Sequence, residues 1–242
     1  IKVIYNIKFI ANFMTICIIP ARSNSQRLKN KNFINFYGKS IISYVIETAK
    51  KSKIFSKIIV STDSKKIASI AKKCGAEVPF IRSKKLSDNF TTSKEVVIDC
   101  IKKISSQKNA YHCCIYPTAV LTKVNDLKKS FNKIKKLKAD YLIAITDFEY
   151  SPIRSLQKRG KNWIKFKEKK YINSRSQDLK TLYHDTGSFY FYKTSVLLKK
   201  RKNLPKKTTY YFIDRTNTVD INSASDLKMA KLKFRLLKEK NG

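Results

Sequence analysis

Cationic side chains gather where an early apolar run ends, in the stretch IIPARSNSQRLKNKN at residues 18–32. The run breaks at Pro20, and the loop after it carries Arg22, Arg27, Lys29 and Lys31. In open α/β sheets, ligands bind at the carboxyl ends of the strands, and cations clustered there favour an anionic ligand such as phosphate. Arginine binds phosphate through two parallel hydrogen bonds and lysine acts as a point charge. Together, Arg22 and Lys31 would suit a triphosphate that releases pyrophosphate.

The overall composition argues for caution, because lysine occurs in nearly every segment. The chain has 53 Lys and Arg against 17 Asp and Glu, a net charge of +36. Such a charge attracts nucleic acid or an acidic membrane surface without specificity. The sequence has no zinc-finger spacing, basic-zipper heptads or aromatic RNP-like strand, so we expect no specific nucleic-acid partner. A basic nucleic-acid-binding protein remains the alternative from another functional class.

Two common phosphate-binding loops are missing from the sequence. Neither G-x-x-x-x-G-K-[ST] nor G-x-G-x-x-G occurs, and the chain has only five glycines. This excludes an ordinary P-loop enzyme or dinucleotide enzyme. In their place the cationic loop offers hydroxyl, amide and backbone donors at Ser23, Asn24 and Ser25.

Strand and helix patterns alternate around this loop. An apolar run at 16–19 precedes it, and helical spacing follows at 39–52. A buried strand at 57–63 leads to an amphipathic helix at 64–75, with Ser64 as its expected cap. The same rhythm continues with further strands and helices expected at 78–81, 93–104, 111–116, 125–138 and 140–146. This order predicts an α/β fold in three layers, with a mostly parallel sheet covered on both faces.

The rhythm fails between residues 151 and 178, where apolar residues lose their regular spacing. We expect a hairpin-like excursion or an inserted flap there. A strand returns at 187–192, and a strand end in the block VDINSASDL leads into a final amphipathic helix capped by Ser223 or Ser225. At 242 residues the chain is long enough for one large domain, which we place at 14–242.

The first 13 residues are too short and too polar to span a membrane. We expect them to be an extension, with Met14 as the natural start, and we expect no membrane partner. The five cysteines are an odd number and mostly lie in apolar stretches. This favours a reduced, cytoplasmic protein.

Several blocks in consistent order identify a family resemblance. The cationic loop is followed by GKSIISYVIETA, IIVSTDSKKIASIAKKCGAEVPFIR and LSDNFTTSKEVV. From about residue 15 to 238 the chain resembles the CMP-sialic acid synthetase family, which loads CMP from CTP onto nine-carbon 2-keto-3-deoxy sugar acids and releases pyrophosphate. The blocks IYPTA (115–119), NSRSQDL (173–179) and YHDTGSFY (183–190) most resemble its pseudaminic acid cytidylyltransferase branch. N-acetylneuraminate and legionaminate remain alternative substrates.

The resemblance implies a Rossmann-like nucleotide-diphospho-sugar transferase fold and a nucleotide site. Arg22 and Lys31 match the family's catalytic phosphate contacts, and Arg82 matches an arginine of the cytosine and ribose pocket. The implied nucleotide-binding residues are Arg22, Ser23, Asn24, Ser25, Lys31, Arg82, Ser87 and Thr118, with Asp88 as the alternative to Ser87. The implied sugar-binding residues are Arg175, Gln177, His184 and Asp185.

The resemblance also implies Mg²⁺ and a homodimer. VDINSASDL resembles the family's D-I-D-x-x-x-D-L block, whose two carboxylates face the ion, so Asp220 is expected as a catalytic metal ligand. The second position is Asn222 here, which could supply an amide oxygen or leave the site impaired. The irregular segment at 152–178 resembles a dimerisation arm that covers a neighbouring active site. No side chain stands out as the general base.

Simpler structural roles compete with these assignments. Arg82 could pair with a surface carboxylate, Asp63 could cap the helix that follows it, and Asp226 could support the last helix. Each alternative is reasonable for a single residue, whereas the ordered blocks favour a common site.

Overall fold

A computed structural model describes residues 15–104, 110–199 and 203–239. The expected extension at 1–13 and the expected start at Met14 lie outside these ranges. The centre of the described chain is a six-stranded sheet with the strand order β10-β6-β9-β5-β1-β4. Its strands are β1 (Ile16–Pro20), β4 (Lys57–Ser61), β5 (Tyr111–Ile115), β6 (Tyr141–Asp147), β9 (Tyr183–Lys193) and β10 (Thr208–Phe212).

The sheet is mostly parallel, as the sequence predicts. Strand β1 pairs in parallel with β4 and β5, and β10 pairs in parallel with β6. Only β9 among these strands runs the other way, antiparallel to both β5 and β6. The carboxyl ends of the other strands therefore meet at one edge of the sheet, where the first residues of β9 also lie.

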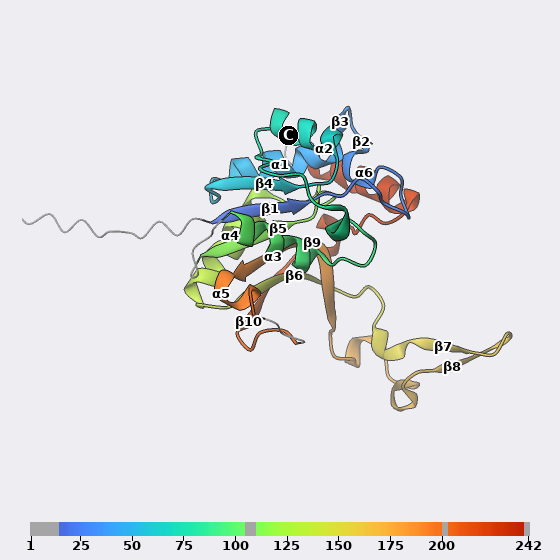
Figure 1. Ribbon diagram of the computed structural model, residues 1–242. Helices are drawn as coiled ribbons and strands as arrows, with labels where there is room; N and C mark the ends of the chain where they lie inside the picture. Colours follow the sequence, from blue (N-terminus) through green and yellow to red (C-terminus); the bar gives the residue numbers. More distant parts are fainter. Residues whose placement is uncertain (1–14, 105–109, 200–202, 240–242) are drawn as a thin grey trace, which may run out of the picture.

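Helices cover both faces of this sheet and complete the predicted three layers (Figure 1). The α-helices are α1 (Ile41–Ser52), α2 (Lys65–Lys73), α3 (Ser93–Lys103), α4 (Val124–Lys136), α5 (Thr194–Leu197) and α6 (Ala224–Glu239). One buried cluster joins Ile46 of α1, Ile67 of α2 and Leu127 of α4 to the sheet. A second cluster packs Val97 of α3 and Leu197 of α5 on the opposite face.

A short hairpin of β2 (Asn35–Phe36) and β3 (Lys39–Ser40) follows a 3₁₀ turn, η1 (Lys31–Phe33). Phe36 of this hairpin is fully buried and packs edge-to-face against Phe234 of α6, with ring centroids 5.2 Å apart. Aromatic pairs of this kind add to the free energy gained by burying the rings. The contact brings the first and last parts of the described chain together beside the cationic loop.

Local caps agree with the sequence. The Ser64 hydroxyl accepts a hydrogen bond from the Ile67 amide at the start of α2, and Gly75 closes that helix at φ 84°. A left-handed conformation of this kind costs least at glycine. Helix α3 begins with a capping box between Thr92 and Glu95, which satisfies two backbone donors reciprocally.

Several elements differ from the sequence predictions. The hairpin β2–β3 and the short helix α5 were not predicted, and residues 219–222 form no strand. Residues 78–81 form no regular strand, because only the isolated bridges Ile59–Glu77 and Thr62–Ile81 tie this segment to the sheet. Strand β10 was not predicted. It lies at the edge of the sheet with Tyr210 and Phe212 about half exposed, so it lacks the apolar run of a buried strand.

The irregular segment at 151–178 contains the expected hairpin, formed by β7 (Leu156–Arg159) and β8 (Trp163–Phe166). Figure 1 shows this hairpin projecting away from the sheet and its helices. Asp147 at the end of β6 pairs with Tyr183 at the start of β9, so the excursion leaves and returns at one place. We refer to residues 148–182 as the arm. No helix in the described ranges is long and apolar enough to cross a membrane.

The cysteines lie where the sequence analysis expects. All five are free, and Cys17, Cys100, Cys113 and Cys114 are buried. Burial raises the pKa of the Cys113 thiol, with the nearby Cys17 and Cys114 adding to the effect, so this side chain packs in the core as a neutral group.

Candidate active site

The cationic loop after β1 is fixed by its neighbours. Asp63, just beyond β4, accepts hydrogen bonds from the Ser23 amide at 2.7 Å and the Ser23 hydroxyl at 2.8 Å. The Asn32 side chain donates to the Arg22 carbonyl at 2.8 Å. Asp63 therefore holds the loop, and the alternative that it caps the following helix is wrong, because Ser64 caps that helix.

The loop forms one wall of a polar cavity of about 420 Å³ at the carboxyl ends of β1 and β5. Five of the expected nucleotide-binding residues line this cavity, namely Arg22, Ser25, Lys31, Arg82 and Thr118. Such a crevice lies where the strand order of an α/β sheet reverses direction, here between β1 and β5. The structure thus brings together residues that lie far apart in the sequence.

Arg82 is the most deeply buried of these cations, with 4% of its surface exposed. Its Nε donates to the Ser87 hydroxyl at 3.1 Å, and no carboxylate forms an ion pair with it in the described chain. The alternative of a surface ion pair is therefore wrong within these residues. Burial lowers the pKa of the guanidinium, Asp63 opposes this shift and Arg22 adds to it. A buried cation without a carboxylate partner favours an anionic ligand.

Lys31 lies in the same cavity and connects it to the C-terminal part of the chain. Its Nζ donates to the Asn222 side-chain oxygen at 3.1 Å. Burial lowers the pKa of the Lys31 ammonium, Asp220 raises it, and Arg27 and Arg22 lower it further. A polyanion that binds Lys31 together with the neighbouring arginines would stabilise the charged form of all of these side chains.

Three expected nucleotide-binding residues do not line the cavity. Ser23 faces Asp63, and Asn24 is exposed. The Ser87 hydroxyl accepts from Arg82 and donates to the Ser83 carbonyl at 2.9 Å. Ser87 therefore does not line the cavity itself, but its hydroxyl binds the Arg82 side chain, which does. Asp88, the alternative to Ser87, does line the cavity, and its carbonyl accepts from Arg22.

The residues expected at the metal lie beside Lys31. The Asn222 side-chain nitrogen donates to the Asp220 carboxylate at 2.6 Å, so one amide links Lys31 to Asp220. Gly187 lies next to this carboxylate, since a Cβ at position 187 would be in ordinary van der Waals contact with the Asp220 Cγ, at 3.4 Å. The same glycine has φ 62°, a conformation that other residues rarely adopt.

These groups fit a magnesium ion with one protein carboxylate. In the ranges that the structure describes, no cluster of three or more His, Cys, Asp or Glu residues could hold a metal. Mg²⁺ needs only one or two carboxylates when phosphate oxygens and water complete its shell. Asp220 provides one such carboxylate near the cations, whereas Asn222 directs its nitrogen toward Asp220 and its oxygen toward Lys31.

A second cavity of about 290 Å³ adjoins the first, and Ser93 and Tyr116 line both. Its walls include four tyrosines, which are Tyr116, Tyr141, Tyr190 and Tyr192. Asp185 accepts from the Tyr190 hydroxyl at 2.6 Å and from the Gly187 amide at 2.8 Å. Burial strongly raises the pKa of Tyr190, so its hydroxyl stays protonated and donates. Aromatic faces beside hydroxyl and carboxylate groups suit a polyhydroxylated ligand.

Only one of the four expected sugar-binding residues lies at this cavity, and it is Asp185. Arg175 pairs with Asp178 at 2.7 Å on the arm, and Gln177 is exposed on the same turn, η5 (Ser176–Asp178). The His184 ring packs on Phe148, with ring centroids 4.7 Å apart. Within one chain these three residues line neither cavity.

The sequence analysis missed the tyrosine wall, although GSFYFY contained a signal. Successive residues of a strand point to opposite faces. Phe189 and Phe191 therefore share one face of β9 and pack in the cluster of α1, α2 and α4. Tyr190 and Tyr192 share the other face, at the second cavity. The alternation of phenylalanine and tyrosine in β9 therefore indicated which face of the strand packs in the apolar core and which face carries hydroxyl groups toward a cavity.

Comparisons with known proteins agree with this geometry. A family model described as cytidylyltransferase matches residues 16–234. The chain is 37% identical over 223 residues to a pseudaminic acid cytidylyltransferase of Campylobacter jejuni, covering 91% of this chain and 96% of the relative. It is 30% identical over 217 residues to a CMP-N,N'-diacetyllegionaminic acid synthase of the same species, covering 88% and 92%.

The fold is also shared with a solved structure of CMP:2-keto-3-deoxy-manno-octonic acid synthetase complexed with CTP. The TM-score is 0.69 at 12% identity, and the match covers 93% of this chain and 99% of the other. This likeness confirms the predicted fold. On the strength of the family match and the curated relatives, the chain belongs to the cytidylyltransferase family and is a nucleotidyltransferase enzyme.

Proposed function

We propose that this enzyme transfers CMP from CTP to pseudaminic acid and releases pyrophosphate. The observation that carries the proposal is the meeting of Arg22, Lys31 and Arg82 in one polar cavity. None of the three forms an ion pair with a carboxylate in the described residues. A nucleoside triphosphate supplies the negative charge that this arrangement lacks.

The two adjoining cavities suggest where each substrate binds. CTP would occupy the polar cavity, with its phosphates near Arg22 and Lys31. The sugar acid would occupy the tyrosine-lined cavity, with Asp185 and the tyrosine hydroxyls binding its hydroxyl and amide groups. The anomeric oxygen would then attack the α-phosphorus in line with the departing pyrophosphate. Orientation of the substrates and neutralisation of phosphate charge would provide most of the catalysis.

The choice of sugar rests on the relatives. Two proteins at 37% identity are pseudaminic acid cytidylyltransferases of Campylobacter jejuni. The legionaminic acid synthases are 27% and 30% identical, and an N-acylneuraminate cytidylyltransferase of Escherichia coli is 24% identical. Pseudaminic acid is therefore the first candidate, and legionaminic acid and N-acetylneuraminic acid are the competitors.

Magnesium belongs to the proposal as well. Cytidylyltransferases are generally metal-dependent, and Asp220 is the carboxylate that would hold the ion here. Bound Mg²⁺ would add positive charge beside the phosphates. The role of the chain itself is to place Asp220 against Gly187, and to hold Lys31 and Asn222 next to it.

We also propose a homodimer in the cytoplasm, formed through the arm. Trp163 is 73% exposed and Ile164 is 65% exposed on a hairpin that stands away from the sheet. Large apolar side chains in such a position favour contact with another protein. In a dimer the arm could bring Arg175 and Gln177 to the partner's sugar site, which would give these residues the function that the family resemblance implies.

The first test is pyrophosphate release from CTP and Mg²⁺ with pseudaminic, N,N'-diacetyllegionaminic or N-acetylneuraminic acid. We expect kcat/KM to be at least roughly tenfold higher with pseudaminic acid, because contacts to its substituents should stabilise the transition state selectively. A higher value with another acid would reassign the substrate. Absence of turnover together with tight, strongly salt-dependent binding to duplex DNA would instead support the nucleic-acid alternative.

Replacing Arg22 by alanine tests the nucleotide site. We expect Arg22→Ala to lower kcat/KM by roughly 10²- to 10³-fold, because a charge near the leaving pyrophosphate is lost. Steady-state kinetics would measure this, with circular dichroism to confirm folding. Arg235→Ala removes an exposed arginine on α6 and is the matched control. Equal activity of the two variants would exclude Arg22 as a phosphate contact.

Replacing Asn222 by aspartate tests the metal site. The change removes an amide that now donates to Asp220 and adds a second carboxylate beside Lys31. We expect Asn222→Asp to lower the Mg²⁺ concentration that gives half-maximal activity, since a second hard oxygen ligand becomes available. Asn132→Asp makes the same charge change at an exposed site on α4. An unchanged Mg²⁺ requirement would place Asn222 outside the metal's ligand shell.

The dimer proposal predicts a change in mass. We expect the unmodified protein to sediment as two chains, and the double variant Trp163→Ser, Ile164→Ser to sediment as one, because the arm loses its exposed apolar surface. Leu236→Ser, which alters an apolar residue of α6 that is 56% exposed, should leave the dimer intact. Sedimentation velocity would measure all three proteins, and a dimeric double variant would show that the interface lies elsewhere.

A further inference from the structure

One face of α6 lies along the segment that carries Asp220. Asp226 and Lys233 are about two helical turns apart, so their side chains project from the same side of the helix. Ala230, between them on this side, is fully buried. Both polar side chains bond the backbone of residues 215–223, which we call the Asp220 segment.

Asp226 holds the C-terminal end of the Asp220 segment, at Asn222 and Ser223. Its carboxylate accepts from the Asn222 amide at 2.9 Å and from the Ser223 amide at 2.8 Å. The backbone hydrogen bond from Asn222 lowers the pKa of Asp226, so the group stays ionised in neutral solution. The Ser223 hydroxyl accepts from the Asp226 amide, which confirms Ser223 as the predicted cap and Asp226 as a support of the helix.

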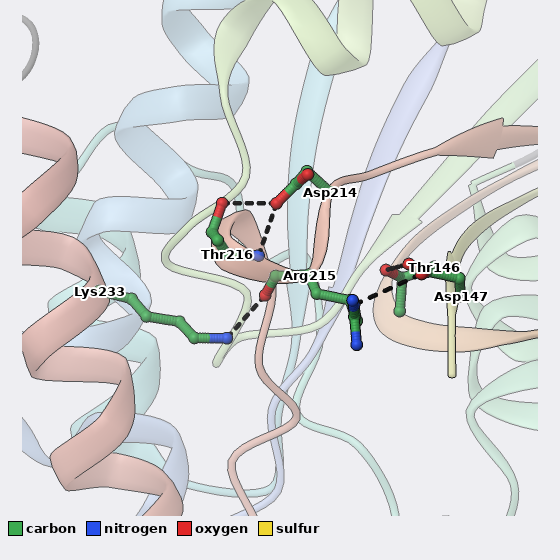
Figure 2. Close-up of polar contacts among 6 residues, drawn as sticks. All are labelled: Thr146, Asp147, Asp214, Arg215, Thr216 and Lys233. Atoms are coloured by element: carbon green, nitrogen blue, oxygen red, sulfur yellow. Dashed lines mark hydrogen bonds and ion pairs between the residues drawn. The ribbon is translucent and has the colours of Figure 1, made fainter. Parts of the chain in front are cut away.

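Lys233 holds the N-terminal end of the Asp220 segment, at Arg215 and Thr218. Its Nζ donates to the Arg215 carbonyl at 2.6 Å and to the Thr218 carbonyl at 2.8 Å. Figure 2 shows Lys233 reaching the turn η6 (Arg215–Asn217), which Asp214 caps through Thr216. The same turn is held to the end of β6, where the Arg215 Nε lies 3.4 Å from an Asp147 carboxylate oxygen.

The Lys233 ammonium is half-buried and has no carboxylate ion pair in the described chain. Burial lowers its pKa, whereas Asp214 and Glu149 act in the opposite direction. Partial removal of a charged group from water is unfavourable unless its hydrogen bonds are good. The two hydrogen bonds from Lys233 to the Arg215 and Thr218 carbonyls compensate for this loss of water, and both can form only when η6 has its present conformation.

We propose that Lys233 is a positioning residue for Asp220. Asp220 lies two residues beyond Thr218 and two residues before Asn222, so α6 holds the backbone on both sides of it. Gly187 of β9 also lies next to the Asp220 carboxylate. Loss of the Lys233 bonds would loosen the backbone at Thr218, which the Arg215–Asp147 ion pair does not reach, and would let the Asp220 carboxylate move relative to Lys31. This inference rests on the proposed function, because it assumes that Asp220 acts in CMP transfer.

Lys233→Met tests the inference, since methionine keeps most of the apolar chain and removes the donors. We expect kcat to fall by roughly tenfold or more while KM for CTP changes less than about twofold, because small misplacement of a reacting group affects the transition state most. Amide hydrogen exchange in peptides that cover 215–223 should become faster, and exchange in β1 and β5 should stay unchanged. Lys233→Arg, which keeps cationic donors, should recover most of the kcat.

Lys228→Met is the matched control, because Lys228 is exposed on the same helix. Equal kcat in Lys228→Met and Lys233→Met would overturn the inference, as would unchanged exchange at 215–223. If Lys233→Met fails to fold, Lys233→Gln takes its place with the same expectations. Failure of the unmodified enzyme to turn over CTP would refute the proposed function instead, and hydrogen exchange would still report whether Lys233 fixes the segment.

Discussion

The meeting of Arg22, Lys31 and Arg82 in one cavity is the constraint on which the rest of the site depends. Burial lowers the pKa of both Lys31 and Arg82, and the nearby Arg22 lowers each of them further. No carboxylate neutralises them by an ion pair in the described residues, so neutral groups must hold them. Asn32 holds the Arg22 backbone, Ser87 holds Arg82, and Asn222 holds Lys31. A carboxylate in any of these places would bind its cation more strongly, but would compete with a phosphate ligand.

The reversed direction of β9 completes the site. Because β9 runs antiparallel to β5 and β6, its first residues return from the arm to the edge where the other strands end. This placement puts Asp185 at the second cavity and Gly187 against Asp220. A parallel strand would place these residues at the opposite edge of the sheet. The single antiparallel strand among the six therefore joins the sugar cavity, the candidate metal ligand and the root of the arm.

Local patterns in the sequence predicted most of the fold, because periodic burial determines where helices and strands form. They failed at residues 78–81, which bond the sheet only through isolated bridges, and at β10, whose edge position leaves aromatic side chains exposed. Arg22 and Lys31 could be predicted as members of one site because their loop follows a strand, whereas only the family resemblance placed Arg82 with them. The Asp63–Ser23 contact could not be predicted, because it depends on strand order. The alternation in GSFYFY indicated the two faces of β9, but not that Tyr116 and Tyr141 would meet Tyr190 and Tyr192 across the sheet.

The large net charge and the local site have different physical effects. Exposed lysines act over a range limited by salt, with a Debye length of about 8 Å at physiological ionic strength. They can raise the local concentration of any polyanion, including CTP and nucleic acid, without discriminating between them. The buried Arg82 and half-buried Lys31 are screened less, and backbone and amide contacts fix their positions. The uniform charge of +36 therefore favours encounter, whereas discrimination requires the few cations that are both buried and without a carboxylate partner in the described chain.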